Sequence, residues 1–126
     1  MTNKTFGDWG ENFVAEEYRK RGFKIVGRNI RLSAGKLLGE IDIIAAKGQL
    51  LVFVEVKSRK NENFMPTLEA VGIFKQRKLL KAAKAYLLGH QGYDKYQKRM
   101  DVATVHPTLD GKFLKCTIIE DAIQDR

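Results

Sequence analysis

The chain has 126 residues, of which 44% are hydrophobic and 30% charged, and its formal net charge is +8. This size, with charged and apolar residues interleaved, fits one folded domain over residues 1–126 and excludes a disordered chain. The single cysteine, Cys116, excludes an internal disulfide and a multi-cysteine zinc site, and no apolar run approaches the roughly 20 residues of a membrane span.

The first half of the chain is predicted to form one helix and three strands. Apolar residues at helical spacing predict a helix over 6–21, which begins after Thr5 and ends at Gly22. Residues 23–30 mix β-forming and basic residues and predict a strand, followed by a turn over 32–38. Residues 38–46 and 49–57 predict an antiparallel hairpin.

The second half is predicted to add one helix and two strands. A polar loop over 58–66 precedes a helix over 73–88, and strands follow over 99–106 and 113–119. The tail from Glu120 is polar and is expected to fray. Helices that separate groups of strands in this order predict an α/β fold, a mixed central sheet flanked by helices, in the order αβββαββ. The N-terminus has no secretion-signal pattern, so we expect a cytoplasmic protein.

Acidic residues interrupt both strands of the hairpin. Strand side chains alternate between faces, so Glu40 shares a face with Asp42, and Glu55 shares a face with Lys57. A two-residue loop at Lys47-Gly48 would place all four on one side, with Asp42 and Glu55 as diagonal neighbours about 7–8 Å apart at the backbone. A three-residue loop would instead put Asp42 and Glu55 on opposite faces.

These acids have the chemistry of a metal site. Carboxylates in β-forming sequence are costly to bury unless a cation meets them, and oxygen ligands suit Mg²⁺ or Mn²⁺. Such an ion at Asp42 and Glu55 would make a water acidic enough to attack a phosphodiester, and Lys57 could orient that water or neutralise the phosphate. Glu11 borders the buried stripe of the first helix and is a candidate third acid.

The alternative is a set of surface salt bridges, in which Glu55 simply pairs with Lys57 or Arg59. The flanking residues count against it, because both faces of the hairpin are partly apolar. Ile41 and Ile43 are expected on the face opposite the acids, together with Val52, Val54 and Val56.

The hairpin resembles the PD-(D/E)xK nuclease superfamily, whose Asp matches Asp42 and whose Glu-x-Lys matches Glu55-Val56-Lys57. Ile41 stands where that motif has proline. More specifically, the chain resembles the bacterial YraN family of predicted endonucleases. The segments that carry this resemblance are Gly7, Gly10, Glu11 and Ala15, then Gly39-Glu40-Ile41-Asp42-Ile43-Ile44-Ala45, Phe53-Val54-Glu55-Val56-Lys57-Ser58-Arg59, Lys75-Gln76-Arg77-Lys78 and Arg99-Met100-Asp101-Val102. They span nearly the whole domain in one order.

The resemblance implies a restriction-endonuclease-like fold, a metal site at Asp42 and Glu55, and Lys57 as catalytic lysine. It also implies that Glu11 is a helix-borne acid, as in archaeal Holliday junction resolvases. The fold alone does not specify an activity or a substrate.

Basic residues near the acids suit a nucleic acid. Lys75, Gln76 and Lys78 at the start of the second helix, and Arg59 after the acidic strand, are candidate phosphate contacts, although a solvated basic helix face gives the same pattern. The first functional hypothesis is a Mg²⁺-dependent nuclease acting on DNA, including branched or junction DNA. The alternatives are a nucleic-acid-binding module that does not cut, and an adaptor whose acids are structural. Cutting two strands would favour a homodimer.

Overall fold

The computed structural model describes residues 5–60 and 72–124. The elements are α1 (Phe6–Lys20), β1 (Lys24–Ser33), β2 (Leu37–Lys47), β3 (Leu50–Ser58), α2 (Ile73–Leu88), a short 3-10 helix η2 (Gln91–Tyr93), β4 (Gln97–Pro107) and β5 (Leu114–Ile119). The predicted order αβββαββ is confirmed. The turn expected over 32–38 is shorter, because β1 and β2 extend into it, and the predicted loop over 58–66 falls outside the described residues from 61 onward.

The strands form one five-stranded sheet in the order β1-β2-β3-β4-β5. Neighbouring strands are antiparallel except β3 and β4, which are parallel. Parallel strands need a crossover connection, and α2 lies in this one. The sheet is therefore mixed, as the sequence predicts.

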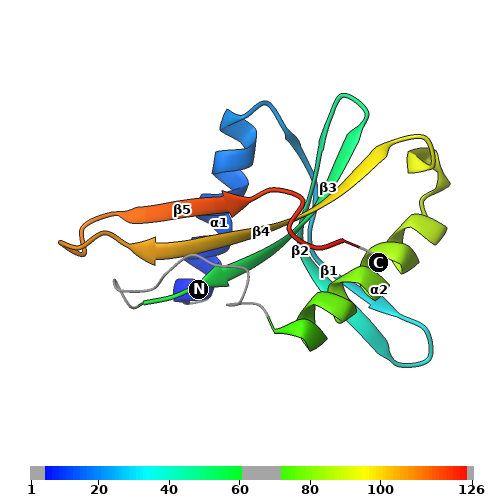
Figure 1. The fold of residues 1–126 in the computed structure, drawn as a ribbon, viewed down its shortest axis with the longest axis horizontal. Helices are drawn as coiled ribbons and strands as arrows, with labels where there is room; N and C mark the ends of the chain where they lie inside the picture. Colours follow the sequence, from blue (N-terminus) through cyan, green and yellow to red (C-terminus); the bar gives the residue numbers. More distant parts are fainter. Residues whose placement is uncertain (1–4, 61–71, 125–126) are drawn as a thin grey trace, which may run out of the picture.

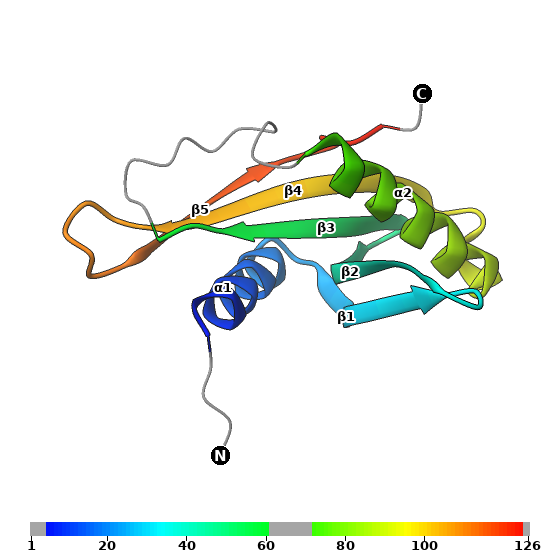
Figure 2. The ribbon, with the colours of Figure 1, turned by 90° about the horizontal axis from the view of Figure 1, so that it is seen from below.

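The two helices cover opposite faces of the sheet, as Figure 1 shows and as Figure 2 shows from below. Each face carries its own cluster of buried apolar residues. The cluster under α1 joins Val14, Ala15 and Tyr18 to Ile43, Ala45, Val52, Val54, Ala103 and Val105. The cluster under α2 joins Leu79, Ala82, Ala83 and Tyr86 to Ile41, Ile44, Leu51, Phe53, Met100, Val102 and Ile123. No helix within the described residues is long and apolar enough to cross a membrane.

The start of α1 is fixed by a capping box. The Thr5 hydroxyl accepts a hydrogen bond from the Asp8 backbone N–H at 3.1 Å, and the Asp8 carboxylate accepts one from the Thr5 backbone N–H at 3.0 Å. These bonds satisfy donors that the first helical turn leaves open. Gly22 follows the helix with a φ of 91°, a backbone angle that glycine adopts without strain.

The β2–β3 hairpin closes one residue later than expected. Lys47 pairs with Leu50, so the loop is Gly48-Gln49, and Gly48 has a φ of 59°. The ladder runs from this pair to Ile43 opposite Val54, which makes Asp42 and Glu55 the next positions in register. The predicted loop at Lys47-Gly48 is therefore wrong, and Asp42 and Glu55 lie just beyond the last pair of the ladder. The two registers differ by an even number of residues, and the hydrogen bond from the Val56 backbone N–H to Asp42 Oδ2, at 2.8 Å, keeps the Asp42 carboxylate beside Glu55.

The C-terminal tail is more ordered than expected. The backbone N–H groups of Ala122 and Ile123 donate to the Met100 carbonyl, at 2.8 and 3.4 Å, and the Ile123 side chain is buried. The expected fraying from Glu120 is wrong as far as Gln124, because this segment fills part of the cluster under α2.

Gly39 permits the close contact between β2 and α2 that the site depends on. A Cβ atom at this position would lie 2.7 Å from the Lys78 carbonyl oxygen and 3.1 Å from the Ala82 Cβ. Because the Lys78 atom belongs to the backbone, a side chain at position 39 would force α2 away from the sheet.

Gly39→Ala is accordingly expected to lower the free energy of unfolding by about 2 kcal/mol, the range found for overpacked cores. Urea unfolding followed by circular dichroism measures this. Gly92→Ala is the matched control, since a Cβ there would meet nothing within 4 Å. Equal stability of the two variants would show that α2 adjusts without cost.

Candidate metal centre

The regular strand pattern is interrupted at Asp42. On β1, Asn29 has a φ of 51°, in the left-handed region that asparagine tolerates better than most residues. It lies between the pairs Arg28–Ile43 and Ile30–Ile41, so its position faces Asp42. Ile41 packs with the cluster under α2, whereas Ile43 packs under α1. The expectation that these two isoleucines share a face is therefore wrong, and the irregularity coincides with Asp42.

Asp42 and Glu55 form a close pair of carboxylates. The Asp42 Oδ2 atom accepts a hydrogen bond from the Val56 backbone N–H at 2.8 Å, while the Glu55 side chain is only 2% exposed. Burial, and then the neighbouring charge of Glu55, raise the pKa of Asp42 to about 7. The surroundings of Asp42 therefore do not fully offset the cost of burying its ionised form.

The positive charge nearest to this pair comes from α2. The Lys75 Nζ atom lies 3.2 Å from the Glu55 Oε1 atom, and the charge of Glu55 raises the pKa of Lys75. Lys75 and Lys78 line a cavity of about 220 Å³ together with Glu40, Asp42 and Glu55. The structure thus places two of the predicted phosphate contacts, Lys75 and Lys78, beside the acids.

The donor set fits a hard divalent cation. Two facing carboxylates supply oxygen ligands, and the raised pKa of Asp42 records a charge conflict that a cation would relieve. Among residues 5–60 and 72–124, no group of three His, Cys, Asp or Glu side chains is arranged to hold a metal ion. A pair of carboxylates with water in the other positions is an arrangement that Mg²⁺ commonly accepts.

Glu11 lies on the other side of Asp42 and is already engaged. Its Oε1 atom accepts hydrogen bonds from Arg28 Nε and Nη2, at 3.1 and 3.0 Å, and from Asn29 Nδ2 at 3.0 Å. Burial raises the pKa of Glu11, and Arg28 opposes that shift. Glu11 and Asp42 share a second depression, of about 300 Å³. A catalytic role for Glu11 stays a prediction.

Lys57 and Arg59 line the same depression as Glu11. Burial lowers the pKa of Lys57, and the charge of Lys75 adds to that effect. The Arg59 guanidinium donates to the Ser58 carbonyl at 3.1 Å, and the Arg59 backbone N–H donates to Val105 at 2.8 Å. Asp42 therefore lies between an anion-rich cavity under α2 and a depression that contains the predicted catalytic lysine.

Gln76 is not among the described residues that line either space. Its backbone N–H donates to the Gly72 carbonyl at 3.0 Å in the first turn of α2, and its side chain is partly buried. The prediction that it contacts nucleic acid gains no support from this placement.

Three residues near the site escaped the sequence-based predictions. Arg28 and Asn29 hold Glu11, and Thr104 lies opposite Lys57 in the β3–β4 register. The Thr104 hydroxyl is buried and has no hydrogen-bond partner among the described residues. An asparagine within the β1 segment was the one available signal, because asparagine is depleted in strands and enriched at positive φ.

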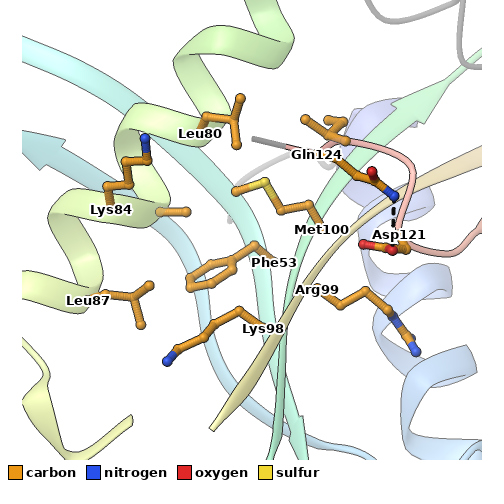
Figure 3. Close-up of a pocket in the computed structure, with 11 residues that line it drawn as sticks. Phe53, Leu80, Lys84, Leu87, Lys98, Arg99, Met100, Asp121 and Gln124 are labelled. Carbon is orange, nitrogen blue, oxygen red and sulfur yellow. Dashed lines mark hydrogen bonds between the residues drawn. The ribbon is translucent and has the colours of Figure 1, made fainter. Parts of the chain in front are cut away.

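A larger cavity, of about 430 Å³, lies on the side of α2 that faces β4 and the C-terminal tail (Figure 3). Phe53, Leu80, Leu87 and Met100 give it a mainly apolar lining, and Asp121 and Gln124 are hydrogen-bonded to each other at its edge. Asp121 is the one carboxylate among the described residues that line it.

Residues 10–105 match the model of the family described as "Uncharacterised protein family UPF0102". The UPF0102 protein of Dictyoglomus thermophilum is 41% identical over 115 residues, which cover 90% of this chain and 92% of the relative. The UPF0102 protein STH1475 of Symbiobacterium thermophilum is 39% identical over 120 residues, covering 95% and 97%.

These matches extend over nearly the full length of both chains and agree with the predicted YraN-like resemblance, and the mixed α/β fold is consistent with the PD-(D/E)xK superfamily. The chain belongs to the UPF0102 family.

Proposed function

We propose that this protein is a metal-dependent nuclease that hydrolyses phosphodiester bonds in DNA, with Mg²⁺ or Mn²⁺ held by Asp42 and Glu55. The observation that carries the proposal is the facing pair of poorly compensated carboxylates, with Lys57 close by on the same strand as Glu55. Structural acids are normally neutralised by their own partners, whereas functional sites retain such electrostatic conflict.

Each group at this site would have a different role in hydrolysis. A bound divalent cation would supply positive charge beside the phosphate and make water more acidic. Burial lowers the pKa of Lys57, and its side chain would orient the attacking water or neutralise the charge that grows on the phosphate. The water oxygen would bond to phosphorus, one P–O bond would break, and the leaving oxygen would take a proton from solvent water to become a hydroxyl group.

The basic residues around the acids would bind the substrate backbone. Lys75 and Lys78 on one side and Arg59 on the other bracket Asp42. Contacts of this kind fix the position of a nucleic acid without reading its sequence. The proposed substrates include junction and branched DNA, because contacts to the phosphate backbone do not require a continuous duplex.

A specific observation favours a second candidate function, a nucleic-acid-binding module that does not cut. One oxygen of Glu11, the candidate third acid, is already engaged by Arg28 and Asn29. If Glu11 keeps its hydrogen bonds to Arg28 and Asn29 when a nucleic acid is bound, the site would still bind phosphates but would lack one catalytic acid. Such a module would bind with a steep salt dependence and release no product.

Cleavage of labelled duplex, single-stranded and junction DNA with Mg²⁺ or Mn²⁺ tests the proposal. Lys57→Ala is expected to slow cleavage by about 100-fold or more, the effect of removing one positioned proton-transfer or charge-stabilising group. Lys95→Ala is the matched control, since it removes the same charge from an exposed position just before β4, at the opposite end of the β3–β4 pair from Lys57. Cleavage that survives unchanged in Asp42→Ala would remove the assignment, and binding without cleavage under every metal would favour the second candidate.

A further inference from the structure

We propose that Lys75 is an exchangeable counter-ion of the carboxylate pair: its ammonium group neutralises Glu55 in the metal-free protein, leaves when a divalent cation binds, and then becomes available to a substrate phosphate. The inference rests on the metal site of the proposed function and assigns Lys75 a role that links metal binding to substrate binding.

The two partners of this ion pair differ sharply in burial. The Glu55 side chain is 2% exposed in the middle of the sheet, whereas the Lys75 side chain is 54% exposed, and their charged atoms lie 3.2 Å apart. The carboxylate is held in place by the surrounding core, while the ammonium stands at the end of a flexible chain that reaches in from α2. Lys75 is therefore the partner that can leave the pair while the rest of the structure stays in place.

Lys75 is also the cation that meets the pair in the metal-free state. Within the described parts of the chain, no ion pair of Glu55 other than that with Lys75 is found, and the Asp42 carboxylate accepts its hydrogen bond from the backbone of Val56. A divalent ion between Asp42 and Glu55 would provide twice the charge and would repel an ammonium only a few ångströms away. The exposed half of the Lys75 side chain gives that group a route into solvent.

The released ammonium would lie at the mouth of the cavity that already contains Lys78. A phosphate entering the site would then meet two lysines, whereas in the metal-free protein one of them is occupied by Glu55. Metal binding and substrate binding would in this way favour each other through one side chain.

Calorimetric titration with magnesium chloride alone, at about pH 9 so that protons compete little with the metal, tests this exchange. Lys75→Gln is expected to bind Mg²⁺ about tenfold more tightly than the unmodified protein, because a competing cation is gone. Lys75→Arg keeps the charge and is expected to behave like the unmodified protein. Lys81→Gln removes the same charge from an exposed position on α2 that is not among the lining residues of this cavity, and is expected to change the affinity by less than about twofold.

A second measurement tests whether the released Lys75 binds a substrate phosphate. Binding of uncut DNA in the presence of Ca²⁺ is expected to weaken in Lys75→Gln and to persist in Lys81→Gln. If the unmodified protein binds Mg²⁺ but Lys75→Gln binds it equally or more weakly, the exchange is wrong and the proposed nuclease site survives. If neither protein binds Mg²⁺, the metal site and the exchange are both wrong.

Discussion

Asp42→Asn is expected to make the metal-free protein more stable at pH 8, by up to about 4 kcal/mol. Burial and the charge of Glu55 raise the pKa of Asp42 from 3.8 to about 7 in the folded protein. Between these two values the folded state holds a proton that the unfolded chain has lost, so the free energy of unfolding falls as the pH rises. Asparagine carries no charge and can still accept the Val56 hydrogen bond, so the variant escapes this loss.

The pH dependence separates this effect from an ordinary change in packing. The advantage of Asp42→Asn is expected to be absent below the unfolded pKa of 3.8, to grow with rising pH and to level off above about 7. Urea unfolding with a chelator at a series of pH values measures it. Asp94→Asn, at an exposed position, is the control and is expected to stay within about 0.5 kcal/mol of the unmodified protein.

Magnesium should narrow the difference in stability between the two proteins. At a free concentration one hundred times the dissociation constant, a ligand of the folded state stabilises it by about 2.7 kcal/mol. We expect that gain for the unmodified protein and none for Asp42→Asn. A variant that is less stable than the unmodified protein at pH 8 without metal would show that Asp42 is already well compensated, and would contradict the proposed metal centre.

The sequence predicted that Asp42 and Glu55 lie close together, although it placed the hairpin loop one residue too early. The prediction holds because it does not depend on which of the two loops forms. Moving the hairpin loop from Lys47-Gly48 to Gly48-Gln49 shifts the register by two residues, and strand side chains repeat every two residues. Such a shift turns no residue of the ladder to the other face, and the two acids, which lie just beyond its last pair, stay close together. Which loop position the glycine takes depends on the pairing of the whole hairpin, and local sequence does not determine it.

Other features depended on contacts between distant residues and could not be predicted locally. Glu11 was placed on the correct helix, yet its partners Arg28 and Asn29 come from a different element, 17 and 18 residues away. The tail after Glu120 looked unstructured because its anchors, Met100 and Asp101, lie in β4. The opposite placement of Ile41 and Ile43 follows from the irregular backbone at Asn29, which the alternating pattern of β2 does not reveal.

Asp101 is the buried acid that contrasts most clearly with Asp42. Its carboxylate is fully buried and accepts hydrogen bonds from the Tyr18 hydroxyl at 2.6 Å, from Arg99 Nε and Nη2 at 2.9 and 3.0 Å, and from the Asp121 backbone N–H at 2.9 Å. Burial, and then the hydrogen bond to Asp101, raise the pKa of Tyr18. Every oxygen of Asp101 thus has partners from α1, β4 or the tail.

Asp101→Ala is expected to lower the free energy of unfolding by about 3–5 kcal/mol, the largest stability change predicted for this protein. The substitution leaves the mostly buried Arg99 without its main partner and the Tyr18 hydroxyl without an acceptor. Chemical denaturation measures the loss. Glu120→Gln is the control, since Glu120 meets the same arginine at 3.6 Å from an exposed position and is expected to cost less than about 1 kcal/mol.

The two aspartates should respond to magnesium in opposite ways, and this separates a structural acid from a functional one. Asp101 is fully neutralised within the protein, so the milder variant Asp101→Asn is expected to be destabilised while its gain in stability from Mg²⁺ stays intact. Asp42 is not neutralised, so Asp42→Asn should be stabilised and should lose that gain. A reduced magnesium response in Asp101→Asn would mean that the bonds joining α1, β4 and the tail also shape the metal centre, because Asp101 itself has no oxygen left to bind an ion.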